Sequence, residues 1–152
     1  VESLTISKQL PNLVFIDIVV YEKIIVISDL RETQPKEVVL YKNLYTELSE
    51  SNNQLPRLTV TNGPVPDGFY SEIISLILTV NKYDLSIQDL SITYNGSELT
   101  GSYKNTLLNI GSPIDLSKKG SVVGYILEEG NCDGEVTIID SNSEDIETIL
   151  NC

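Results

Sequence analysis

The residues with the clearest chemical potential are carboxylates near the C-terminal end of the chain. Glu128, Glu129, Asp133 and Glu135 lie within eight positions, together with Asn131 and two glycines. Clustered carboxylate, amide and carbonyl oxygens are the ligands that Ca²⁺ prefers in proteins. These residues form a candidate Ca²⁺ site. Their spacing is not that of an EF-hand loop, and a solvated acidic loop is the alternative interpretation.

Composition excludes several other kinds of chemistry. The chain has no His, which rules out Ser-His-Asp and Cys-His catalysis and histidine metal ligands. Its 10 basic and 22 acidic residues give a net charge of -12, so nucleic-acid phosphates would be repelled. Paired carboxylates can hydrolyse glycosides, but the chain has no Trp on which a sugar ring would stack. We therefore expect a protein that is not an enzyme, with no cofactor unless Ca²⁺ binds.

Two cysteines and one sequon indicate the compartment. Cys132 and Cys152 lie twenty residues apart, and a disulfide between them would hold the C-terminal end against the loop at 129–134. Two buried free thiols are the alternative. Asn95 begins the glycosylation sequon Asn-Gly-Ser. Together these features predict an extracellular or cell-surface protein.

The elements that must position these residues read as short strands separated by turn signals. Strands are expected at Glu2–Ser7, Leu13–Val20, Lys23–Ser28, within Glu37–Ser49, and at Arg57–Thr61, Phe69–Val80, Leu85–Tyr94, Glu98–Lys104, Thr106–Asn109, Ser121–Leu127 and Glu135–Asp140. The segments 13–20 and 23–28 are expected to form a hairpin or one long bent strand. Charges at Asp17, Glu22 and Lys23 interrupt this most apolar region, so no membrane span is expected.

Turn chemistry completes the outline of the elements. Asn95-Gly96 is a strong hairpin signal between two expected strands, and Pro64 and Pro66 mark 61–68 as a loop. Ser117-Lys118-Lys119-Gly120 is expected to be a turn. Ser141 and Glu144 have the spacing of a capping box, so 142–150 is expected to be a short helix, with a final edge strand as the alternative.

This pattern predicts a single all-β domain over residues 1–152. With 13–28 counted as one long bent strand and 37–49 ambiguous, the nine or ten short strands favour an antiparallel β-sandwich, Ig-like or jelly-roll-like, with a short C-terminal helix as an option. A βαβ architecture is not expected, since no expected strand is followed by a long amphipathic helix pattern.

The N-terminal segment suggests a way to associate. Leu4 and Ile6 lie on one face of the expected strand 1–7, which the connector 8–12 joins to the rest of the chain. Such a strand either pairs within its own sheet or is exchanged, adding to the edge of a neighbouring molecule. A head-to-tail contact of the second kind that does not close produces a filament.

The region 73–127 resembles the β-sandwich domains of archaeal type IV pilin-like surface proteins, which include archaellins and adhesive pilins. The resemblance is carried by the segments 73–81, 85–96 and 117–126, which read as a strand ending in Asn, a strand ending in Asn-Gly, and a polar turn before a Gly-containing apolar strand. It implies an archaeal surface filament protein with a β-sandwich fold. Those proteins begin with a long hydrophobic helix, whereas residues 1–17 have no such pattern.

Together these features predict a structural subunit or accessory protein of an extracellular filament or surface appendage. It would self-assemble through β-strand contacts, without nucleic-acid partners. A viral coat or spike sandwich would have the same sequence features. The alternative is a monomeric secreted binding module that recognises a glycan or a partner protein through the loop Asn62–Gly68.

Overall fold

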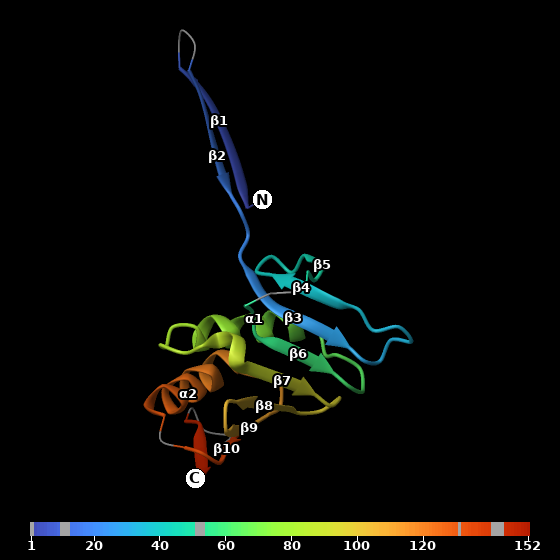
Figure 1. Cartoon of the computed structure of the whole chain (residues 1–152), viewed down its shortest axis with the longest axis vertical. Helices are drawn as coiled ribbons and strands as arrows, with labels where there is room; N and C mark the ends of the chain where they lie inside the picture. Colours follow the sequence, from blue (N-terminus) through green and yellow to red (C-terminus); the bar gives the residue numbers. More distant parts are fainter. Residues whose placement is uncertain (1, 10–12, 51–53, 131, 141–144) are drawn as a thin grey trace.

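The computed structural model describes residues 2–9, 13–50, 54–130, 132–140 and 145–152 (Figure 1). Strands dominate these residues, as the sequence predicts. The strands are β1 (Ser3–Gln9), β2 (Leu13–Val19), β3 (Lys23–Asp29), β4 (Glu37–Tyr41), β5 (Thr46–Leu48), β6 (Arg57–Val60), β7 (Leu90–Tyr94), β8 (Leu99–Tyr103), β9 (Thr106–Gly111), β10 (Glu135–Ile139) and β11 (Glu147–Asn151). The helices are α1 (Phe69–Val80), α2 (Leu116–Glu129) and the short 3-10 helix η1 (Ile87–Asp89).

Nine of these strands form one large sheet. Their order is β11-β10-β9-β8-β7-β6-β3-β4-β5. The pairs β3–β6, β6–β7 and β9–β10 are parallel, and the other pairs in this sheet are antiparallel. The sheet is therefore mixed, which corrects the expectation of antiparallel pairing throughout.

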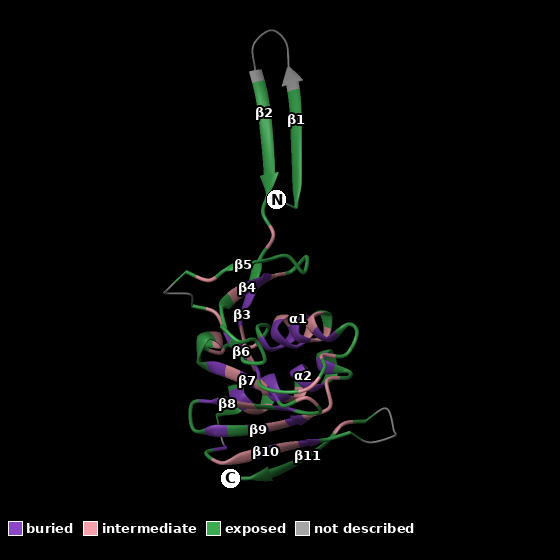
Figure 2. Cartoon of the chain, turned by 90° about the vertical axis from the view of Figure 1, so that its right-hand side faces the viewer, coloured by how far each residue is buried: buried purple, intermediate pink, exposed green. Residues whose placement is uncertain are grey.

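Two βαβ crossovers, β6–α1–β7 and β9–α2–β10, link parallel neighbours in this sheet. This corrects the expectation that βαβ units are absent. Both crossovers run in the same direction across the sheet, and crossovers of this kind share one hand. The helices therefore lie on the same side of the sheet, as Figure 2 shows. The core fills the space between this face and the helix pair.

The segments 69–80 and 121–127 were expected to be strands, and both predictions were wrong. Ile, Val and Phe favour strands, but tertiary context overrides that weak preference. The buried positions of α2 recur at helical spacing: Leu116, Lys119, Gly120, Val123, Gly124 and Leu127. The expected turn at 117–120 is likewise the first part of this helix. A parallel crossover also needs a long connection, which a helix supplies.

The sheet has one apolar and one polar face over β6–β10. Leu58, Ile92, Leu108 and Val136 are buried toward the helices. Most alternate positions carry hydroxyl and amide side chains on the opposite face, with the exposed Leu107 as an apolar exception: Thr59, Ser91, Thr93, Thr100, Ser102, Asn109 and Thr137. Strand alternation thus gives this part of the sheet one side for the core and one for solvent.

The remaining strands, β1 and β2, form a separate two-stranded sheet, called here the N-terminal hairpin. The hairpin projects from the end of the molecule next to β3–β5, and both views show it clear of the large sheet (Figures 1 and 2). The expected hairpin or continuous strand over 13–28 was wrong, because β2 pairs with β1 whereas β3 pairs with β4 and β6.

Turn signals in the rest of the chain were more reliable guides. The turn at Asn95-Gly96 joins β7 to β8, as predicted. The C-terminal tail ends in the edge strand β11, which was the alternative to a helix, and the capping-box residues 141–144 lie outside the described residues. Among the described residues, no helix is long and apolar enough to cross a membrane.

Candidate functional site

The N-terminal hairpin has two faces of different chemistry. Leu4 pairs with Ile18, Ile6 with Ile16, and Val14 lies on the same side. We call these five side chains the apolar hairpin face. Because side chains alternate along a strand, the other face carries Ser3, Thr5, Ser7, Phe15, Asp17 and Val19. Lys8 pairs with Val14, so a basic residue borders these five side chains.

The apolar hairpin face is open to solvent. Its five residues are each between 56% and 63% exposed. An isolated two-stranded hairpin is marginally stable in water and needs further strands or a packing partner. A contiguous exposed apolar surface rimmed by polar groups marks an interaction site. The structure therefore places Leu4 and Ile6, predicted for strand donation, on a surface suited to contact with another molecule. In the chain itself, β1 pairs with β2.

A second candidate surface is a groove of about 680 Å³ beside the N-terminus of α1. Its floor is apolar and comes from Ile27, Val38, Leu40 and Phe69. This volume falls within the range of small-ligand pockets. Charged residues also line the groove: Asp29, Glu32, Lys36 and Asp67. The arrangement can hold an apolar group among carboxylates.

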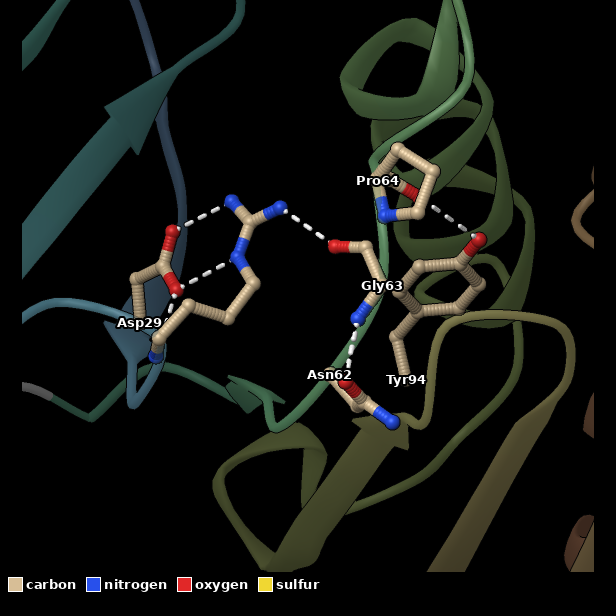
Figure 3. A network of polar contacts seen from close by, with 6 residues as sticks. Asp29, Asn62, Gly63, Pro64 and Tyr94 are labelled. Carbon is tan, nitrogen blue, oxygen red and sulfur yellow. Dashed lines mark hydrogen bonds and ion pairs between the residues drawn. The ribbon is translucent and has the colours of Figure 1, made fainter.

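The loop 61–68 forms one wall of this groove and is fixed by polar contacts (Figure 3). Arg31 donates to Asp29 through Nε at 2.8 Å and through Nη1 to the Gly63 carbonyl at 2.8 Å. The buried Tyr94 donates its hydroxyl to the Pro64 carbonyl at 3.2 Å. Gly63 also passes close to Gly96, where a Cβ on Gly63 would lie 2.5 Å from the Gly96 Cα. The loop is thus held against both β3 and the β7–β8 turn.

Two titratable groups along the groove have pKa values shifted from their ordinary values. Hydrogen bonding from the Arg31 side chain lowers the pKa of Asp29 and outweighs the opposing effect of burial. Burial raises the pKa of the Tyr70 hydroxyl, and the nearby Asp29 carboxylate adds to the effect. Both groups therefore stay in their ordinary ionisation states near neutral pH, with Asp29 charged and Tyr70 neutral.

The predicted disulfide is present. Cys132 and Cys152 are bonded, with their Cα atoms 4.8 Å apart. The bond joins the start of β10 to the end of β11, so it holds the edge strand in place. Asn95 is exposed in the β7–β8 turn, where its side-chain oxygen accepts hydrogen bonds from the backbone of Ser97 and Glu98. The sequon is therefore at the surface.

The four carboxylates predicted to bind Ca²⁺ have separate surroundings. Glu128 is near the end of α2 and accepts a hydrogen bond from the Asp84 backbone at 2.9 Å. Glu135 lies on β10 and accepts one from Asn109. Glu129 ends α2 and Asp133 is exposed before β10. Among the described residues, no three acidic or cysteine side chains form a group that could hold a metal ion.

A polar cluster that the sequence analysis missed lies where β9 and β10 end. The Lys119 side chain is 1% exposed, and its Nζ lies 2.6 Å from Asp140 Oδ1. Nζ also donates to the Ser112 carbonyl at 2.8 Å, and the Ser112 hydroxyl donates to Asp140 Oδ2 at 2.7 Å. Asp140 and Ser112 thus provide polar partners for the buried Lys119 ammonium group, and this cluster supports the fold.

The sequence contains patterns that indicate the apolar hairpin face and the buried Lys119. Alternation in 2–7 and 14–18 marks two amphipathic strands, and pairing them would have revealed the apolar hairpin face. Leu116, Val123 and Leu127 with Lys119 mark a helix whose buried lysine needs a partner. The groove has no comparable signal, because β3, β4 and α1 assemble it from distant parts of the chain.

No protein-family model matches the chain, and no curated protein sequence matches it.

Proposed function

We propose that the chain is a non-enzymatic structural subunit or accessory protein of an extracellular filament or surface appendage, and that it self-assembles through β-strand contacts. The exposed apolar hairpin face carries this proposal. Its residues would leave water on association, and burying one Leu, Ile or Val side chain contributes about 1.5–3 kcal/mol. The disulfide is compatible with an extracellular location.

The edges of the large sheet supply further contacts. β5 and β11 are the two outermost strands, so each has one unpaired side. β11 has every residue exposed and lies at the opposite end of the molecule from the N-terminal hairpin (Figure 1). A subunit with association surfaces at both ends is suited to a linear assembly.

Light scattering across a concentration series tests the proposal. The wild-type protein should form species whose size grows with concentration, and micrographs should show fibres or tubes. In Ile6→Thr/Ile16→Thr, two paired residues of the apolar hairpin face become polar while their β-branched shape is kept. This variant should associate at least about tenfold more weakly, since 1.4 kcal/mol corresponds to a factor of ten.

The matched control changes the opposite face at the same level of the hairpin. Thr5 pairs with Asp17, and Thr5→Ser/Asp17→Glu keeps both polarity and charge. It should assemble as the wild type does. A wild-type protein that stays monomeric at every concentration, with and without millimolar Ca²⁺, would refute the proposal; a response to Ca²⁺ would support metal binding.

The groove favours a second candidate function. The loop Asn62–Gly68, predicted to bind a glycan or partner protein in the alternative interpretation, contributes Val65, Pro66, Asp67 and Gly68 to the groove wall. A strict monomer that binds a ligand in this groove would be a secreted binding module. Leu44→Glu places a charge among the groove residues and should abolish such binding without changing the molecular mass in solution.

A further inference from the structure

We propose that the N-terminal hairpins of two copies of this chain stack on each other, apolar hairpin face against apolar hairpin face. This inference rests on the proposed function and names the contact through which self-assembly begins. It commits to a second copy as the partner of this face.

The chemistry of the two hairpin faces sets which side is buried. Leu4, Ile6, Val14, Ile16 and Ile18 include no charge and no side-chain hydrogen-bonding group. Stacking these five side chains therefore removes no polar group of theirs from water, with Lys8, the partner of Val14, at the border of the contact. The opposite face carries Asp17 and three hydroxyl side chains, which would lose their hydration in the same contact.

The apolar hairpin face is better suited to contact with the same face of a second copy than to contact with the groove. The groove has an apolar floor, but Asp29, Glu32, Asp67 and Lys36 also line it. An apolar ribbon lying over these groups would desolvate them without offering a partner. The five apolar side chains of a second copy bring no charged group of their own into the contact. Identical surfaces can also meet in a two-fold contact.

The contact area sets the expected strength of the contact. A side chain of this size has on the order of 100 Å² of apolar surface. Two hairpins contribute five such residues each, all more than half exposed. Stacking them would bury on the order of 600 Å², which is below the roughly 1,200 Å² of standard stable interfaces. The stacked pair is therefore a weak, concentration-dependent dimer that further contacts must reinforce.

The hairpin is placed where two copies can approach. It projects beyond the large sheet in both views, so the body of the molecule does not cover the apolar hairpin face (Figures 1 and 2). The Ile6–Ile16 pair lies midway between the Leu4–Ile18 pair and Val14. In a two-fold contact centred on this pair, residues 6 and 16 of one copy lie against residues 6 and 16 of the other.

Cysteine crosslinking of the full chain tests the stacking. Both native cysteines are in the disulfide, so an introduced cysteine is the one free thiol. Ile6→Cys and Ile16→Cys, oxidised alone or mixed, should give a covalent dimer of twice the mass on a non-reducing gel. Thr5→Cys and Asp17→Cys, at the same level on the opposite face, should remain monomeric. Each variant is first checked by circular dichroism for the wild-type spectrum.

The outcomes separate this inference from the proposed function. Large species without crosslinks at positions 6 and 16 would overturn the stacking and leave self-assembly standing. Crosslinks of Ile16→Cys to a Leu44→Cys partner, but not to itself or to Ile6→Cys, would place the hairpin in the groove and also overturn it. A wild-type monomer at every concentration would refute both. Equal crosslinking on the two faces would show random collision and overturn the stacking.

Discussion

At the scale of single residues, the ion pair between the buried Lys119 and the half-exposed Asp140 gives the fold its clearest pH dependence. Burial opposes ionisation of Asp140, but hydrogen bonds from Lys119 and Ser112 outweigh it, so the pKa of Asp140 is lowered in the folded protein. A lowered folded-state pKa stabilises the fold fully above the unfolded-state pKa. That stabilisation is lost as the pH falls through the folded-state pKa.

We expect Asp140→Asn to lower the free energy of unfolding by about 1–2 kcal/mol at neutral pH, because Lys119 loses its charged partner while remaining buried. The figure is modest because the Asp140 side chain is 48% exposed. The difference from the wild type should shrink at acid pH, where the protonated Asp140 is as uncharged as the Asn that replaces it. Urea unfolding over a pH series measures it.

The exposed Asp133 offers a control for this measurement. Asp133→Asn should change stability little at any pH, since Asp133 is exposed. A constant difference between Asp140→Asn and the wild type from neutral to strongly acid pH would contradict the assigned role of the ion pair.

At the scale of elements, the two helices pack closely because α2 has glycines on the contact side. A Cβ on Gly120 would lie 3.1 Å from the Leu76 carbonyl oxygen of α1, and a Cβ on Gly124 would collide with the ring of Tyr83, which follows the end of α1. Gly124→Ala should lower the free energy of unfolding by about 1–3 kcal/mol through overpacking, despite the helix-propensity gain of about 1 kcal/mol.

Thermal unfolding followed by circular dichroism measures this effect. Ser121→Ala is the matched control, because Ser121 is an exposed residue of the same helix and gains propensity without a clash. The control should match or slightly exceed the wild type. A Gly124→Ala protein as stable as Ser121→Ala would show that α2 does not pack tightly against Tyr83 at this position.

The elements also show what the sequence could and could not predict. Alternation and turn residues located β1, β6, β8 and β10 to within two residues, because local chemistry determines these features. The helix α1 was missed because its Ile and Val favour strands and only the parallel neighbours β6 and β7 require a crossover. The disulfide was predictable from two cysteines. The groove was not, because distant segments form it.

At the scale of the whole molecule, charge and apolar surface act in opposite directions. The net charge of -12 makes copies repel one another, whereas the apolar hairpin face favours their association. Salt screens the repulsion beyond roughly 8 Å at physiological ionic strength and leaves the hydrophobic contact intact. Self-assembly should therefore be studied in the presence of salt.

The most direct test of the central claim, that the N-terminal hairpin is an association surface, is amide hydrogen exchange of residues 2–20 at rising protein concentration. A free two-stranded hairpin opens readily and exchanges fast, whereas a stacked one is protected. We expect exchange of this segment to slow as concentration rises, while exchange of the buried strands β6 and β7 stays constant. Equally fast exchange of residues 2–20 at every concentration would contradict the account.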